Sequence, residues 1–223
     1  MNTNKTHILS LAIFPPIAWF ATFVQKKTII EIHETFYKQT YRNRYSILSA
    51  NGALDLSVPI HKPYGHHSKT TDIKILYETE WQQQHKNSLI AAYKSSPYFE
   101  FFTDDIFNVL NSEHNSLYEL SIASINACLK IMKIRAEINK TSSYIHQYDV
   151  NEYVDLRNYI NPKNKEYKKN INSPPYKQVF SEKYNFVDNL SVLDLIMNLG
   201  LDSIEYLRKY TDENLDRITG LTR

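Results

Sequence analysis

The residues best suited to chemistry lie between positions 33 and 44, where polar and charged side chains follow one another. His33 and Glu34 place an imidazole beside a carboxylate, a pair that can move protons near neutral pH. Arg42 and Arg44 are two residues apart, so on a strand their guanidinium groups would share one face and could bind a phosphate or a carboxylate. The alternatives are a hydrogen-bonded strand end for the first pair and surface ion pairs for the second. Lys38, Gln39 and Asn43 complete the segment.

A β-hairpin is predicted directly after this segment. Alternating runs at residues 45–50 and 54–60 flank Asn51-Gly52, and both turn residues tolerate the positive φ angles of a type I′ turn. The hairpin would hold Arg42 and Arg44 in a fixed register.

A β-sheet must position the whole segment. Apolar, β-branched runs at residues 7–13 and 28–32 predict two buried strands, and the second delivers His33 and Glu34 at its carboxyl end. Residues 45–50, 54–60 and 72–76 supply the remaining strands.

Helices surround this sheet in the predicted fold. They are expected to begin at Ile17, Glu80, Tyr98, Ser116 and Ser191. The fold class is therefore α/β, a single domain with a mixed β-sheet flanked by helices and a helical insertion. The domain is expected at residues 1–212, its helical part at about 80–133, and a C-terminal tail at residues 213–223.

One predicted helix carries a second histidine of interest. Trp81 and His85 are four residues apart and so share a helix face, where His85 could act as a base beside a stacking ring. The alternative is a core histidine bound to a backbone carbonyl group.

Composition excludes several classes of function. The chain has 223 residues, 42% of them hydrophobic, which is ample for one core, and a formal net charge of +2 gives no push toward nucleic acid. Only four glycines occur and none forms a glycine-rich phosphate loop, so a Rossmann fingerprint and a P-loop are ruled out, and no cofactor is expected. The single cysteine, Cys128, indicates a reducing compartment and a buried position.

Two features invite interpretations that we disfavour. The apolar residues 8–24 are interrupted by two prolines and are too short to span a membrane. The loop at residues 59–70 carries His61, His66 and His67, but adjacent imidazoles without Cys or Asp between them rarely converge on one metal ion. The loop could instead cover a phosphate or a sugar as a lid.

A set of motifs runs through nearly the whole chain. They include Phe14-Pro15-Pro16-Ile17, the run from Lys38 to Arg44, Asp155 with Arg157, Asn161-Pro162-Lys163 and Pro175-Tyr176-Lys177-Gln178-Val179-Phe180. In these motifs the sequence resembles the WbqC-like family of bacterial proteins, in the branch common in Bacteroidetes-type bacteria. The resemblance implies a cytoplasmic protein associated with surface-polysaccharide gene sets, suspected to be an enzyme. It adds Arg157 and Lys163 to the cationic residues.

The predicted function is a group-transfer enzyme of transferase type, linked to surface polysaccharide (O-antigen or capsule) or related metabolism and acting on a phosphorylated or nucleotide-activated substrate. The catalytic residues would be His85, His33 and Glu34, and the binding residues Lys38, Gln39, Arg42, Asn43, Arg44, Trp81, Arg157 and Lys163. The alternative is a non-catalytic sugar- or nucleotide-binding or assembly factor that uses the same cations with stacking rings. The expected partner is a small anionic molecule, with no nucleic acid, metal or membrane span.

Overall fold

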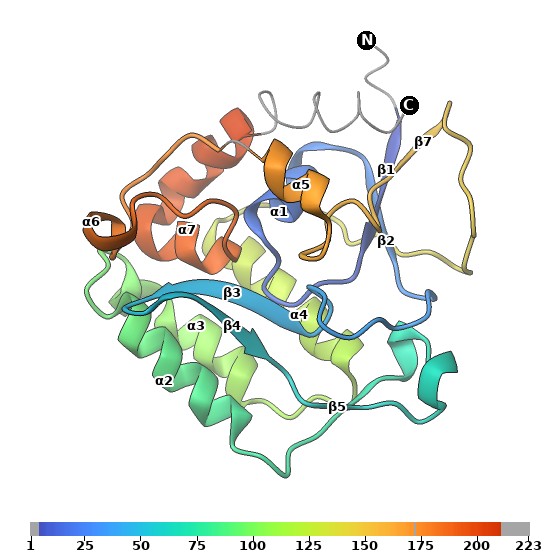
Figure 1. Cartoon of the computed structure of the whole chain (residues 1–223), viewed down its shortest axis with the longest axis horizontal. Helices are drawn as coiled ribbons and strands as arrows, with labels where there is room; N and C mark the ends of the chain where they lie inside the picture. The colour runs from blue at the N-terminus through green and yellow to red at the C-terminus, as the bar shows by residue number, and fades with distance from the viewer. Residues whose placement is uncertain (1–4, 172, 211–223) are drawn as a thin grey trace.

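The first strand of the structure lies in a sheet of three parallel strands (Figure 1). The structure is a computed structural model that describes residues 5–171 and 173–210. β1 (Thr6–Ser10) lies between β2 (Thr28–Glu31) and β7 (Tyr153–Asp155). Because the neighbours of β1 lie on opposite sides, the strand order reverses at β1, and ligands of open α/β sheets bind at the carboxyl edge of such a reversal.

Two antiparallel strand pairs accompany the parallel sheet. β3 (Arg44–Ser49) and β4 (Gly52–Ser57) form the predicted hairpin. The predicted type I′ turn at Asn51-Gly52 is wrong, because Ser49 pairs with Gly52 and the turn residues are Ala50 and Asn51. Of Asn51 and Gly52, only Gly52 has a positive φ, of 99°. β5 (Ile60–His61) pairs with β6 (Lys74–Ile75). The strand predicted at residues 54–60 is thus divided in two, because Pro59 has no N–H group to continue the ladder. The predicted α/β fold class is confirmed, and its strands are distributed over three small sheets.

Three successive helices form a layer in which the first packs against β3 and each packs against the next (Figure 1). These are α2 (Trp81–Tyr93), α3 (Phe99–Asn111) and α4 (Leu117–Ile131). The predicted cap of α4 is present, since the Ser116 hydroxyl group accepts a hydrogen bond from the Glu119 backbone N–H at 3.2 Å. Among the described residues, no helix combines the length and the apolar character that a membrane crossing requires.

The remaining helices are α1 (Ile17–Gln25), α5 (Lys165–Asn170), α6 (Ser181–Tyr184) and α7 (Val192–Leu199), with short 3-10 turns at Gly65–His67, Thr70–Asp72 and Gly200–Asp202. Residues 203–210 are helical, and the tail predicted at residues 213–223 lies outside the described residues.

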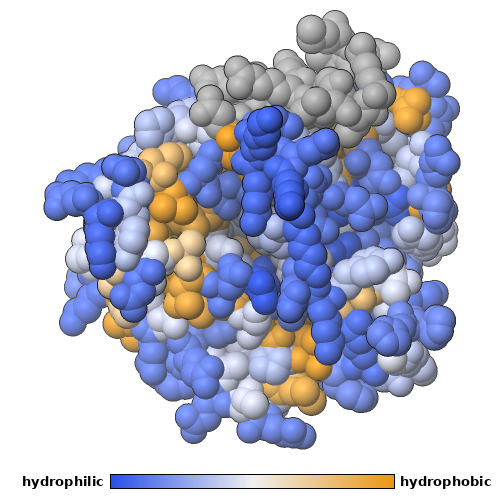
Figure 2. Space-filling model, viewed as in Figure 1, coloured by the Kyte–Doolittle hydropathy of each residue, from blue (hydrophilic) through white to orange (hydrophobic). Residues whose placement is uncertain are grey.

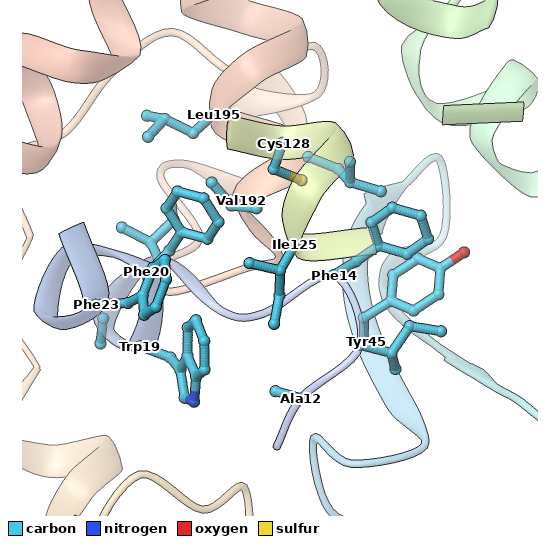
Figure 3. Packing of buried hydrophobic residues seen from close by; sticks show 14 of the residues in the cluster. Ala12, Phe14, Trp19, Phe20, Phe23, Tyr45, Ile125, Cys128, Val192 and Leu195 are labelled. Atoms are coloured by element: carbon cyan, nitrogen blue, oxygen red, sulfur yellow. The ribbon is translucent and has the colours of Figure 1, made fainter. Parts of the chain in front are cut away.

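The core lies where α1, α4 and α7 meet the hairpin (Figure 3). Trp19 and Phe23 of α1 stack at 5.2 Å between ring centres, and Phe14 meets Tyr45 of β3 edge-on at 5.1 Å. Cys128 of α4 is fully buried among these apolar side chains, and burial raises the pKa of its thiol. It therefore packs as a small apolar residue rather than as a reactive thiolate.

Candidate functional site

The carboxyl end of β2 begins the segment that carries most of the predicted site residues. Glu31 is fully buried, and its carboxylate accepts hydrogen bonds from the His33 backbone N–H at 2.7 Å and from the Thr141 hydroxyl group at 3.0 Å. The half-buried His33 ring places Nε2 at 3.1 Å from the Thr141 carbonyl oxygen. A carbonyl oxygen only accepts, so Nε2 carries the proton and Nδ1 is left as the basic nitrogen.

Glu34 and Arg42 form a buried ion pair at the end of β1. Nη2 of Arg42 lies 2.6 Å from one oxygen of Glu34, and Nε lies 2.9 Å from the other. The remaining guanidinium N–H groups donate to the hydroxyl groups of Thr40 at 3.1 Å and Ser10 at 2.8 Å. Arg42 is thus neutralised by the protein itself, and it ties the loop after β2 to the central strand.

Arg157 holds a second loop at the same edge of the sheet. Its guanidinium group pairs with Asp155 at 2.5 Å and with Glu31 at 3.3 Å, and it donates to two backbone carbonyl groups of residues 145–146. Only 4% of its side-chain surface is exposed. The Ser10 hydroxyl group donates to the Arg157 carbonyl oxygen at 3.3 Å, so Ser10 connects the two buried arginine networks.

Arg44 points away from these networks. It is the first residue of β3, and it pairs across the hairpin with Asp55 at 3.0 Å and with the Ser57 hydroxyl group at 3.0 Å. Arg42 belongs to the turn before the strand, which is closed by a hydrogen bond from the Asn43 N–H to the Thr40 carbonyl oxygen. The prediction that the two guanidinium groups share one strand face is therefore wrong, because the turn interrupts the alternation of side chains.

His85 lies beneath the hairpin. Its Nδ1 is 3.1 Å from the hydroxyl group of Tyr45, its Nε2 is 3.3 Å from the Ser57 carbonyl oxygen, and only 3% of the residue is exposed. Burial lowers the pKa of His85 to about 4, so the ring is neutral at pH 7. Nε2 donates to the carbonyl group and Nδ1 accepts from the phenol, so both ring nitrogens are occupied within the protein.

Asn43 and Trp81 are also buried. The Asn43 side chain donates to the Val58 carbonyl oxygen at 3.1 Å, which fixes the base of the hairpin. Trp81 meets the His85 ring edge-on at 5.1 Å between ring centres. Both side chains are thus placed to support the hairpin from within.

Three lysines gather at the loop after β2, of which Lys38 and Lys163 are exposed and Lys62 is half-buried. Lys62 donates from Nζ to the Phe36 carbonyl oxygen at 3.1 Å, and Lys163 donates to the Lys38 carbonyl oxygen at 3.2 Å. Gln39, next in the chain, is exposed and has a φ of 60°, a conformation that costs energy for a residue with a side chain. We call Lys38, Lys62 and Lys163 the lysine cluster.

The lysine cluster carries charge that the described part of the protein does not balance. Within residues 5–171 and 173–210, none of its ammonium groups forms an ion pair with a carboxylate. Partial burial and the nearby charge of Lys38 lower the pKa of Lys62. Figure 2 shows a hydrophilic band down the middle of the molecule, which includes the place where Figure 1 labels α5. Lys62 and Lys163 reach backbone carbonyl groups two residues apart, and positive charges gathered on one loop are suited to an anion.

Lys62 was not among the predicted site residues. Its position in the histidine loop suggested a lid, and only the folded chain shows that its Nζ reaches the loop of Lys38. His61, His66 and His67 of the same loop are exposed, and among the described residues no group of three or more His, Cys, Asp or Glu is arranged to hold a metal ion.

A buried carboxylate joins two of the sequence motifs elsewhere in the fold. Asp194 of α7 accepts hydrogen bonds from the Tyr176 hydroxyl group at 2.5 Å and from the Gln178 side chain at 3.0 Å. Burial raises the pKa of Asp194. These bonds attach the extended segment before α6 to α7, which is a structural task.

Comparison with known protein families identifies the family of the chain. The model of a family described as the WbqC-like protein family matches residues 12–206. No curated protein and no solved structure matches the chain.

Proposed function

The chain belongs to the WbqC-like protein family, and from this premise we propose that it is a cytoplasmic group-transfer enzyme of surface-polysaccharide or related metabolism that acts on a phosphorylated or nucleotide-activated substrate. The observation that carries this proposal is the lysine cluster, three ammonium groups without a carboxylate partner in the described part of the chain, beside the carboxyl edge of the parallel sheet.

The substrate-binding part of the proposal assigns the anion to the lysine cluster. Lys38 and Lys163 were predicted for this role from the sequence, and Lys62 is added because it donates to the same loop. Gln39, exposed beside Lys38, supplies a neutral hydrogen-bonding group. Arg42 and Arg157 act through the backbone, because their ion pairs hold the two loops that carry Lys38 and Lys163.

The proton-transfer part assigns the base to His33. Its Nδ1 is left basic by the hydrogen bond from Nε2 to the Thr141 carbonyl oxygen, and the residue stands at the start of the segment that leads to Lys38. His85 is enclosed by Tyr45 and Ser57, so the proposal leaves it a structural role. Glu34 is likewise committed to Arg42.

A second candidate is a non-catalytic binding or assembly factor. The enclosure of His85 and the neutralisation of both buried arginines favour it, because fewer titratable groups then remain for chemistry.

Turnover of a donor molecule separates the two candidates. Purified protein is incubated with nucleotide sugars, sugar phosphates and acyl-CoA donors together with a mixture of hydroxyl- and amine-bearing acceptors, and donor consumption is followed by mass spectrometry. The enzyme proposal expects one donor class to be consumed, with loss of turnover in His33→Gln and retention of ligand-induced thermal stabilisation. Gln at position 33 can still donate to Thr141, and His67→Gln, at an exposed position, is the matched control.

Two outcomes would contradict the proposal. Stabilisation by a donor without any consumption selects the binding factor. Full turnover in His33→Gln removes His33 as the base.

A further inference from the structure

Two exposed aromatic rings lie in the loops that form the lysine cluster. Tyr37, directly before Lys38, is 60% exposed, and Tyr64, two residues after Lys62, is 66% exposed. Aromatic side chains are usually buried in a folded domain or at an interface, and two exposed rings in paired loops are therefore available to stack on a ligand.

Backbone pairing brings the two loops together. Thr35 and Lys69 form an antiparallel bridge, and the Phe36 N–H donates to the Ser68 carbonyl oxygen at 2.9 Å. Phe36 is buried and its neighbour Tyr37 is exposed, which is the alternation of an extended segment. Tyr37 therefore lies on the outer side of this ribbon, beside the turn that Tyr64 begins.

The turn of Tyr64 is itself fixed. The Tyr64 N–H donates to the Ser68 hydroxyl group at 3.0 Å, and the His67 N–H donates to the Tyr64 carbonyl oxygen at 3.1 Å. Lys62 reaches from the start of this turn to the Phe36 carbonyl oxygen. The rings of Tyr37 and Tyr64 and the lysines beside them thus belong to one ribbon, whose backbone is fixed by hydrogen bonds.

Flat rings next to ammonium groups match the two parts of a nucleotide. Ammonium groups bind phosphate oxygens, and exposed tyrosine rings stack on the faces of bases. We infer that the ligand of the lysine cluster is a nucleoside diphosphate or a compound that contains one, with its phosphates at the lysines and its base on Tyr37 or Tyr64. This inference rests on the proposed function, since it needs the lysine cluster to bind an anion.

Calorimetric titration with pyrophosphate, UDP, ADP and glucose 1-phosphate tests the inference. UDP or ADP should bind about tenfold more tightly than pyrophosphate, which corresponds to the stacking of one base. The double variant Tyr37→Leu/Tyr64→Leu should lose this tenfold gain and bind pyrophosphate as the wild type does. Phe101→Leu on α3, which alters a side chain that is 74% exposed, is the matched control and should change nothing.

The outcomes separate the inference from the proposal beneath it. Equal affinity for pyrophosphate and both nucleotides overturns the nucleotide inference and leaves the anion site standing. Glucose 1-phosphate bound as tightly as UDP, with loss in the double variant, overturns it in favour of a sugar platform. A single-stranded oligonucleotide bound more tightly than either mononucleotide also overturns it. Absence of binding by all four compounds contradicts the anion site itself.

Discussion

Replacing His85 by Gln should make the stability of the protein less dependent on pH. The histidine is buried beneath the hairpin and its pKa is lowered to about 4 by burial, whereas an unfolded histidine titrates near 6.5. Because the folded protein binds fewer protons at this site than the unfolded chain does, stability falls as the pH falls from about 6.5 toward 4. Gln can donate to the Ser57 carbonyl oxygen and accept from Tyr45, but it does not titrate.

The expected size follows from the two pKa values. At pH 7 both states carry a neutral imidazole, and the site contributes almost nothing to pH dependence. At pH 5 the unfolded chain is protonated and the folded ring is not, which lowers the free energy of unfolding by about 2 kcal/mol through His85 alone. The difference in unfolding free energy between wild type and His85→Gln should therefore change by about 2 kcal/mol between pH 7 and pH 5.

Urea unfolding followed by circular dichroism at both pH values measures this change. Taking the difference between the two proteins cancels the contribution of other groups, including His7, whose pKa is also lowered by burial. If the difference in unfolding free energy between wild type and His85→Gln stays constant with pH, the conclusion that His85 is enclosed and neutral is refuted. Should the variant fail to fold, NMR titration of the wild-type ring gives the same answer, with a midpoint near 6.5 contradicting the reasoning.

Two further predictions concern buried interactions. Arg42→Met should destabilise the protein by about 3–5 kcal/mol, since it leaves Glu34 charged and buried. Adding Glu34→Met should restore much of that loss. A single Arg42→Met variant that is as stable as wild type would contradict the buried ion pair. Gly200→Ala should lower the free energy of unfolding by about 2–4 kcal/mol, because the φ of Gly200 is +57° and an added Cβ would lie 2.5 Å from the Tyr98 ring. Gly65→Ala, with the same φ but open space around it, should lower it by about 1 kcal/mol. Equal melting temperatures of the two variants would refute the steric part of this prediction.

Much of the local structure could be predicted from the sequence. The alternating runs around Asn51-Gly52 predict the hairpin, although its turn lies one residue earlier, at Ala50 and Asn51. The Ser116 cap marks the start of α4. Both signals depend on neighbours in the chain. The carboxyl end of β2 was also placed correctly, with His33 and Glu34 following it.

The direction of the arginine side chains could not be predicted in this way. Arg42 lies in a turn because the Asn43 N–H donates to the Thr40 carbonyl oxygen. Its guanidinium group donates to Glu34 and to Ser10, which is 32 positions away in the sequence. Such long-range pairing is decided by the packing of loops against the sheet, which leaves no local pattern.

The same limit applies to the cations of the candidate site. Lys62 and Lys163 are remote in sequence, yet both donate to backbone carbonyl groups of the loop after β2. The motif containing Lys163 pointed to positive charge near the arginines, and the folded chain brings that charge to Lys38 instead.

The most direct test of the anion site is a calorimetric titration of pyrophosphate into two triple variants of equal charge. One variant replaces the three residues of the lysine cluster by Gln. The other replaces Lys86, Lys94 and Lys130 of the helical part by Gln. We expect the first variant to lose pyrophosphate binding and the second to keep the wild-type affinity, with affinity falling as salt rises. Equal binding by both variants would contradict the account, since the anion would then be held elsewhere.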